Sequence, residues 1–154
     1  MYTPLHIDSD TERTAAQPCG RLESFLKWLH QYVPYRIYYR PPFGRASVEH
    51  QLASRQSFPE RDWSNYHHSI DFVRRILEVI TGSMNLPNAN IVPDDPIRLV
   101  FTEAYDDFQY IDALDNLNKT MGTNIAFAEL RRMYQDNLTM GDFMNYVAAM
   151  AKLR

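Results

Sequence analysis

Two adjacent carboxylates, Asp106 and Asp107, are the residues of this chain that most readily suggest acid–base chemistry. Paired carboxylates act as general acid and base when they face each other and share one proton. Successive residues of a helix point about 100° apart, so this pair would not share a proton. We therefore interpret both as acids at a helix N-terminus, where the helix dipole stabilises negative charge.

The sequence gives little support for a metal site or for a catalytic nucleophile. His67 and His68 are adjacent, but a metal site needs three or four convergent ligands. Cys19 is the single cysteine, so an internal disulfide and a cysteine metal cluster are both excluded. No glycine-rich phosphate loop is present. Since nothing supplies nucleophile, base and orienting group together, the sequence predicts no catalytic residue, metal, cofactor or enzymatic activity.

A basic and aromatic segment, Tyr35-Arg36-Ile37-Tyr38-Tyr39-Arg40-Pro41-Pro42-Phe43-Gly44-Arg45, contains three arginines and no acid. Its adjacent prolines favour an extended path rather than a helix. Tyrosine and arginine are enriched at protein interfaces, but together they also suit single-stranded RNA. We predict contact with a protein partner through Tyr35, Arg36, Tyr38, Tyr39, Arg40, Phe43 and Arg45. The alternative is RNA contact through Arg36, Arg40 and Arg45.

The elements that must position these residues divide the chain into two parts. Residues 1–66 are predicted to form an N-terminal arm that is irregular apart from one helix at about 21–33. That helix has an apolar stripe from Leu22 to Val33, and Pro34 ends it. Residues 46–66 hold scattered aromatic residues among polar ones, so we expect irregular chain there.

Residues 67–154 are predicted to form a helical domain of four helices, because apolar residues recur at spacings of three and four. Ser69 is expected to cap the first helix and Thr139, with Asp142, to form a capping box on the last. The second helix should begin near Asp106 and stop at Gly122. The expected apolar stripes are Ile70, Val73, Leu77 and Ile80; Phe108, Ile111, Leu114, Leu117 and Met121; Phe127, Leu130 and Tyr134; and Phe143, Tyr146, Val147 and Met150.

Four local motifs in this order resemble the acyl carrier protein family over roughly residues 69–153. Ile91-Val92-Pro93-Asp94-Asp95 is similar to the family's Val-x-Pro-Asp, and Asp106-Asp107-Phe108 to the start of its second helix. Met121-Gly122-Thr123-Asn124-Ile125 is similar to Phe-Gly-x-x-Ile. Leu138-Thr139-Met140-Gly141-Asp142-Phe143-Met144-Asn145-Tyr146-Val147 is similar to Thr-Val-Gly-Asp-x-x-x-Tyr-Ile. The resemblance implies an all-α, acyl-carrier-like four-helix bundle, extended here by the N-terminal arm and its additional helix.

The resemblance also bears on function, because Asp107 stands where the family keeps the serine that carries phosphopantetheine. A carboxylate does not accept that arm, so no cofactor is expected; a less favoured reading gives Asp107 the role of a permanent charge in place of a phosphate. The family meets basic patches on its enzymes through acids of the second helix. Asp106, Asp112 and Asp115 are the acids here that the resemblance implies for partner binding.

The length, composition and net charge of the chain limit which folds and functions are possible. A chain of 154 residues, 45% of them hydrophobic, supports one domain or a small domain with a long extension. The net charge of −3 gives no global reason to expect nucleic acid. No apolar run is long enough to span a membrane. Residues 1–12 lack the apolar core of a secretory signal, and Asp8, Asp10 and Glu12 are unlike a mitochondrial presequence.

The function that we predict is a non-catalytic structural or docking subunit with a degenerate acyl-carrier fold, anchored by its arm in a larger complex. Acyl carrier proteins recur in mitochondrial respiratory and ribosomal complexes, so by analogy a mitochondrial, matrix-side location is favoured, with a cytoplasmic one as the alternative. Two other functions stay open. One is a working carrier with an atypical attachment site, and the other is an RNA-associated subunit of a ribonucleoprotein such as a mitochondrial ribosome.

Overall fold

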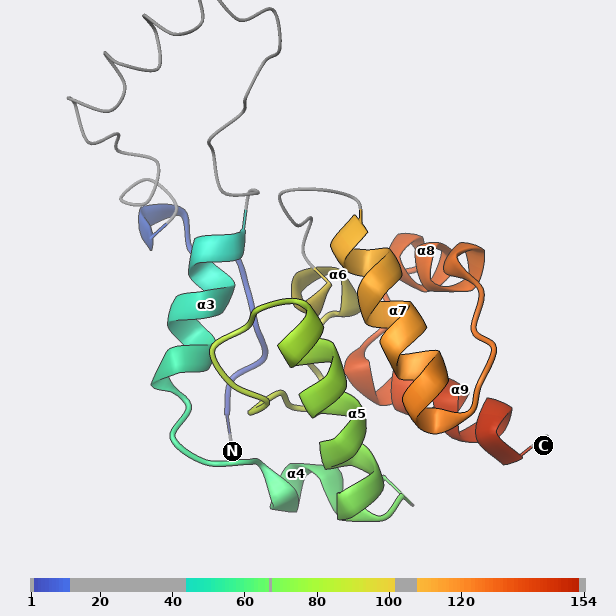
Figure 1. Ribbon diagram of the computed structural model, residues 1–154. Coiled ribbons are helices and arrows are strands. Elements are labelled where there is room, and N and C mark those ends of the chain that lie inside the picture. Colours follow the sequence, from blue (N-terminus) through green and yellow to red (C-terminus); the bar gives the residue numbers. More distant parts are fainter. Residues whose placement is uncertain (1, 12–43, 67, 102–107, 153–154) are drawn as a thin grey trace, which may run out of the picture.

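The computed structural model describes residues 2–11, 44–66, 68–101 and 108–152, except for the side chains of Phe108 and Lys152. Helices make up the regular structure of these segments, and no strand occurs among them beyond a single bridge between Pro96 and Thr139 (Figure 1). The prediction of an all-α fold class is therefore confirmed for the described part of the chain. The expected helix at about 21–33 lies outside it.

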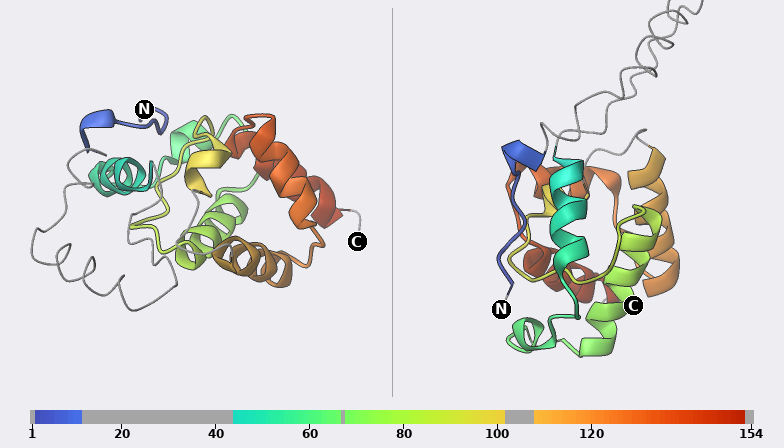
Figure 2. Two further views of the ribbon diagram at one scale, coloured as in Figure 1. Left: turned by 90° about the horizontal axis from the view of Figure 1, so that it is seen from above. Right: turned by 90° about the vertical axis from the view of Figure 1, so that its left-hand side faces the viewer.

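Among the described residues, seven helices have defined bounds. They are α3 (Arg45–Ser54), α4 (Glu60–Trp63), α5 (Ile70–Ser83), α6 (Ile97–Val100), α7 (Phe108–Met121), α8 (Phe127–Gln135) and α9 (Met140–Lys152). α5 and α7 lie side by side, and α3 flanks α5 on the side away from α7 (Figures 1 and 2). α8 and α9 close the other end of the molecule, where the C-terminus lies. The result is a helical assembly around one core.

The caps follow from the residues at the helix ends. Ser69 caps α5, since its Oγ accepts a hydrogen bond from the backbone N–H of Phe72 at 3.2 Å. The capping box of α9 is formed by Thr139 and Asp142, in which each side chain accepts a hydrogen bond from the backbone N–H of the other residue, at 2.9 and 3.3 Å. α7 ends at Met121, where Gly122 adopts a positive φ of 66°. All three predictions are confirmed.

Several expected stripe residues lie in the core, but two do not. Ile111 and Phe127 remain 49% and 46% exposed, so their assignment to the core is wrong. In their place the core receives residues that lie beside the predicted stripes, namely Ile76, Ala113, Met133, Met140 and Met144. The buried faces thus contain predicted stripe residues such as Val73, Leu117 and Val147 together with these neighbours, whereas Ile111 faces outward on α7.

The chain before residue 67 contributes to the same core. Leu5, Leu52 and Trp63 are at most 2% exposed and belong to the hydrophobic cluster that also contains buried residues of α5, α7 and α9. The indole Nε1 of Trp63 donates a hydrogen bond of 2.8 Å to the carbonyl of Ile91. Residues 46–66, expected to be irregular, hold α3 and α4 instead. The expected boundary between residues 66 and 67 thus falls inside this packed region.

Candidate functional site

The exposed face of α7 carries the acids that the sequence singled out for partner binding. Asp112 and Asp115 are exposed on this helix, and Ile111 lies next to them with about half of its surface open to solvent. The opposite face of α7 buries Ala113 and Leu117 and packs against α5. We call Ile111, Asp112 and Asp115 the α7 face. It combines one large apolar side chain with two carboxylates, on a helix whose opposite face is packed against α5.

One cation lies at the edge of the α7 face. Lys119 Nζ donates to Asp115 Oδ2 at 2.5 Å, one helical turn further on, and both side chains are well exposed. This hydrogen bond from Lys119, with the charges of Asp115 and Asp112, raises the pKa of the Lys119 ammonium above its usual value. Lys119 therefore stays protonated. It partly neutralises the charge of Asp115.

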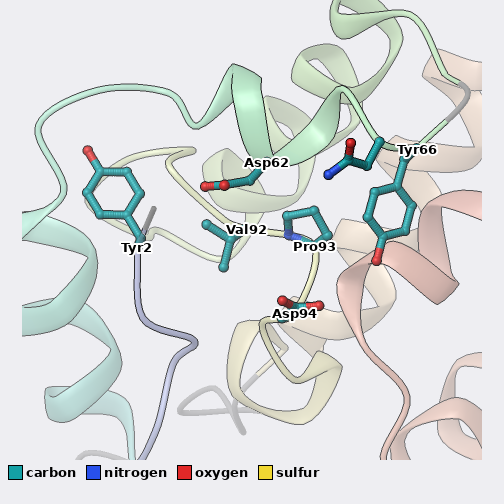
Figure 3. A pocket seen from close by; sticks show the side chains of 7 residues that line it. Tyr2, Asp62, Tyr66, Val92, Pro93 and Asp94 are labelled. Carbon is teal, nitrogen blue, oxygen red and sulfur yellow. The ribbon is translucent and has the colours of Figure 1, made fainter.

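A pocket of about 380 Å³ opens on another part of the surface. It lies between α4, which supplies Asp62, and the chain at 92–94, with Tyr2 at one end and Tyr66 at the other (Figure 3). Its lining is completed by Asn65, Val92, Pro93 and Asp94. Two carboxylates between two tyrosine rings suit a positively charged group, because carboxylates pair with cations and ring faces attract them.

Tyr66 is held at its end of the pocket by close packing. A side chain at Gly141 would overlap the Tyr66 ring, so the absence of a Cβ at position 141 lets the ring approach α9. Burial of the Tyr66 hydroxyl raises its pKa above the ordinary value of 10.0, and the negative charges of Asp94 and Asp142 act in the same direction. Tyr66 is thus a neutral hydrogen-bonding group at the pocket at neutral pH.

A buried ion pair lies close to Tyr2, which lines the pocket. The guanidinium of Arg55 donates to both oxygens of Asp95, at 2.6 and 3.0 Å, and the two side chains are 4% and 0% exposed. Arg55 also lies over the Tyr2 ring at 5.5 Å. Asp95 accepts two backbone N–H groups, from Leu5 at 2.7 Å and Val92 at 2.8 Å. All of these contacts are internal, so the pair orders the surrounding segments rather than offering a reactive group.

The predicted basic segment is represented in the structure by its last residues. Arg45 was expected in an extended arm, but it is the first residue of α3 and is 7% exposed. Its Nη2 donates to the carbonyls of Met84 and Asn85, at 2.7 and 3.0 Å, and its Nε pairs with Glu49. Arg45 is thus buried and hydrogen-bonded inside the fold rather than exposed on an extended arm. The other members, Tyr35, Arg36, Tyr38, Tyr39, Arg40 and Phe43, lie outside the described residues, as do Asp106 and Asp107.

Sequence reasoning missed the pocket of Tyr2, Asp62, Tyr66 and Asp94. These residues come from three separate segments and match no spacing rule, so nothing in the sequence indicates that they meet. Across the described segments, no group of three or more His, Cys, Asp or Glu side chains is placed to hold a metal ion. His68, considered in that role, instead shares a hydrogen bond of 2.8 Å with Asn145 Oδ1.

Within the described residues, none of the helices has the length and apolar character needed to cross a membrane. Comparison of the chain with protein-family models, with curated proteins and with solved structures gives no match.

Proposed function

We propose that this protein is a non-catalytic docking module with a degenerate acyl-carrier fold that serves as a subunit of a larger complex. The observation that carries the proposal is Ile111, a large apolar side chain left half exposed beside two exposed carboxylates on α7. Scattered apolar residues are common on protein surfaces. Ile111 is distinguished by its place in a charged helix face whose reverse side is fixed in the core.

The chemistry of the α7 face selects a kind of partner. Asp112 and Asp115 attract a basic surface and steer its approach, while desolvation of Ile111 supplies the apolar part of the contact. The partner that fits is a protein surface with lysine or arginine around an apolar recess. The mitochondrial setting rests on analogy with the acyl carrier family alone.

The experiment compares the native particle formed by the full chain with that formed by the Ile111→Ser variant, in gentle extracts of the source. We expect the unaltered chain to migrate in a large assembly and Ile111→Ser to shift toward its 18.1 kDa mass. Loss of an interface anchor costs more than about 1.4 kcal/mol, or tenfold in affinity. Mass spectrometry of the assembly then identifies the neighbours.

Phe127→Ser is the matched control, because Phe127 is 46% exposed but lies on a different helix, α8. It should leave the assembly intact. If the unaltered chain itself migrates as a free 18.1 kDa species, the proposal of a stable subunit fails. If Ile111→Ser stays in the assembly, the docking surface lies elsewhere on the molecule.

A further inference from the structure

Residues 2–8 form an extended segment, here called the N-terminal strap, that lies along α3 and runs opposite to it (Figures 1 and 2). Side chains of α3 hold the strap by its backbone. Gln51 Nε2 donates to the carbonyl of His6 at 2.6 Å, and Gln51 Oε1 accepts from the N–H of His6 at 3.2 Å. The amide of Gln51 therefore pairs with His6 as a neighbouring strand would.

The same pattern repeats one turn earlier on α3. Ser47 Oγ accepts a hydrogen bond from the N–H of Asp8 and donates one to the carbonyl of the same residue, both at 2.9 Å. Ser47 and Gln51 lie four residues apart on α3, and the residues that they contact lie two apart on the strap. This register fits an extended chain laid against one face of a helix.

The buried ion pair continues this recognition toward the N-terminus. Asp95 Oδ1 accepts the N–H of Leu5 at 2.7 Å, and Arg55 Nη2 donates to the carbonyl of Thr3 at 2.6 Å. Because the Arg55 guanidinium and the Asp95 carboxylate form an ion pair, each holds the other in an orientation that lets it bind the strap. Four residues of the strap are thus bound through main-chain atoms, which every peptide carries.

A single side chain of the strap enters the core. Leu5 is 2% exposed and joins the hydrophobic cluster, whereas its neighbours Pro4 and His6 are exposed. Main-chain recognition along an extended segment, with a pocket for an apolar side chain, is one way in which proteins bind short peptides. In sequence, residues 9–44 separate the strap from α3, so the strap belongs to the same chain as its site and acts as a tethered ligand.

We propose that α3 together with Arg55 and Asp95 forms a peptide-binding groove for an extended segment with an aliphatic anchor, and that residues 2–8 are its ligand in cis. When the strap leaves, the Leu5 site opens and Tyr2 is withdrawn from the pocket of Figure 3. The groove then takes an extended segment with the same pattern from another molecule. This inference is independent of the α7 face, because it rests on other residues and another helix.

The test uses the full chain with Leu5→Asp, which places a charge at the buried anchor and releases the strap. The probe is a fluorescently labelled peptide of residues 2–11, and its binding is followed by fluorescence anisotropy. We expect saturable binding to this variant, at least tenfold tighter than to the unaltered chain, whose groove is occupied. The probe carrying the same Leu5→Asp change should bind at least tenfold more weakly, and addition of Gln51→Ala to the chain should weaken binding as well.

His6→Asp in the full chain is the matched control, since it puts the same charge on the neighbouring, exposed side chain. It should leave the strap in place and keep probe binding at the level of the unaltered chain. A folded Leu5→Asp chain, judged by helical circular dichroism and cooperative unfolding, that binds the probe no better than the unaltered chain overturns the proposal. If Leu5→Asp does not fold, Leu5→Ala replaces it under the same criteria.

Discussion

At the scale of single residues, the Arg55–Asp95 pair connects segments far apart in sequence. Its hydrogen bonds reach Thr3 and Leu5 in the strap and Asn90 and Val92 in the chain before α6. A buried pair contributes little net stability when it is intact, because desolvation of both charges offsets their attraction. Removal of one partner is different, since it leaves the other charge buried and unpaired.

Arg55→Met should therefore lower the free energy of unfolding by about 3–5 kcal/mol, because it strands the Asp95 carboxylate in the core. Urea unfolding followed by circular dichroism measures the change. Glu60→Gln is the control, since the Arg74–Glu60 pair has side chains 41% and 63% exposed. Loss of such a surface pair should cost less than about 1 kcal/mol. Equal effects of the two substitutions would contradict the role given to the buried pair.

Tyr66 gives the protein a dependence on alkaline pH. Its pKa is raised in the folded state by burial, with Asp94 and Asp142 adding to the effect. The stability linked to this group is fully present below the unfolded pKa of about 10, and is lost as pH rises toward the folded pKa. We expect the free energy of unfolding to fall more steeply above pH 10 for the unaltered chain than for Tyr66→Phe. Parallel pH profiles for the two proteins would show that Tyr66 is not the group responsible.

At the scale of elements, helices with an apolar stripe could be predicted, and a capping residue also located the start of a helix. α5 and α9 have both features, so their starts at Ser69 and Thr139 follow from the sequence. α3 buries Arg45 and Ser47 beside Val48 and Leu52, so its inward face is partly polar and gives no stripe. The hydrogen bonds of those polar residues to the strap and to the end of α5 explain why they can be buried there with Val48 and Leu52.

The two misassigned side chains show a second limit at this scale. Ile111 and Phe127 fit the helical period but lie at the edge of their stripes, near the first turns of α7 and α8. Periodicity marks the apolar side of a helix, yet the neighbours that cover it decide which edge residues are buried. The acids of the candidate site were found from the sequence, whereas the exposure of Ile111 beside them required the packing of α7 on α5.

The capping box of α9 supports a prediction for one element. Thr139→Ala removes the Oγ that accepts from the Asp142 N–H and donates to the Asp142 carboxylate, so we expect a loss of about 1 kcal/mol in unfolding free energy. Thr139→Ser keeps the hydroxyl and should restore most of that loss. Chemical denaturation of the three proteins measures the difference. If the serine variant is no more stable than the alanine variant, the hydroxyl does not stabilise α9.

At the scale of the whole molecule, the boundary drawn from the sequence between residues 66 and 67 does not coincide with a gap in the packing. The sequence shows a change of character there, from scattered aromatic residues to regular stripes. Trp63 was interpreted as one of those scattered aromatic residues. It is completely buried, and its indole donates a hydrogen bond to the carbonyl of Ile91 before α6. A single buried aromatic residue is sufficient to join two segments, and composition gives no sign of it.

Deletion of residues 1–66 tests which description of the molecule holds. The fragment 67–154 would lose Leu5, Leu52 and Trp63 from the core, and Asp95 would lose the guanidinium of Arg55. Truncation of one buried tryptophan to alanine alone costs about 3–5 kcal/mol, comparable to the total stability of many domains. We therefore expect the fragment to show no cooperative thermal unfolding by circular dichroism, whereas the full chain should unfold cooperatively. The deletion of residues 1–8 alone removes only the strap and should lower the melting temperature without abolishing the transition. A fragment 67–154 that melts like the full chain would instead establish two separable units, with the arm as an appendage that a partner could hold.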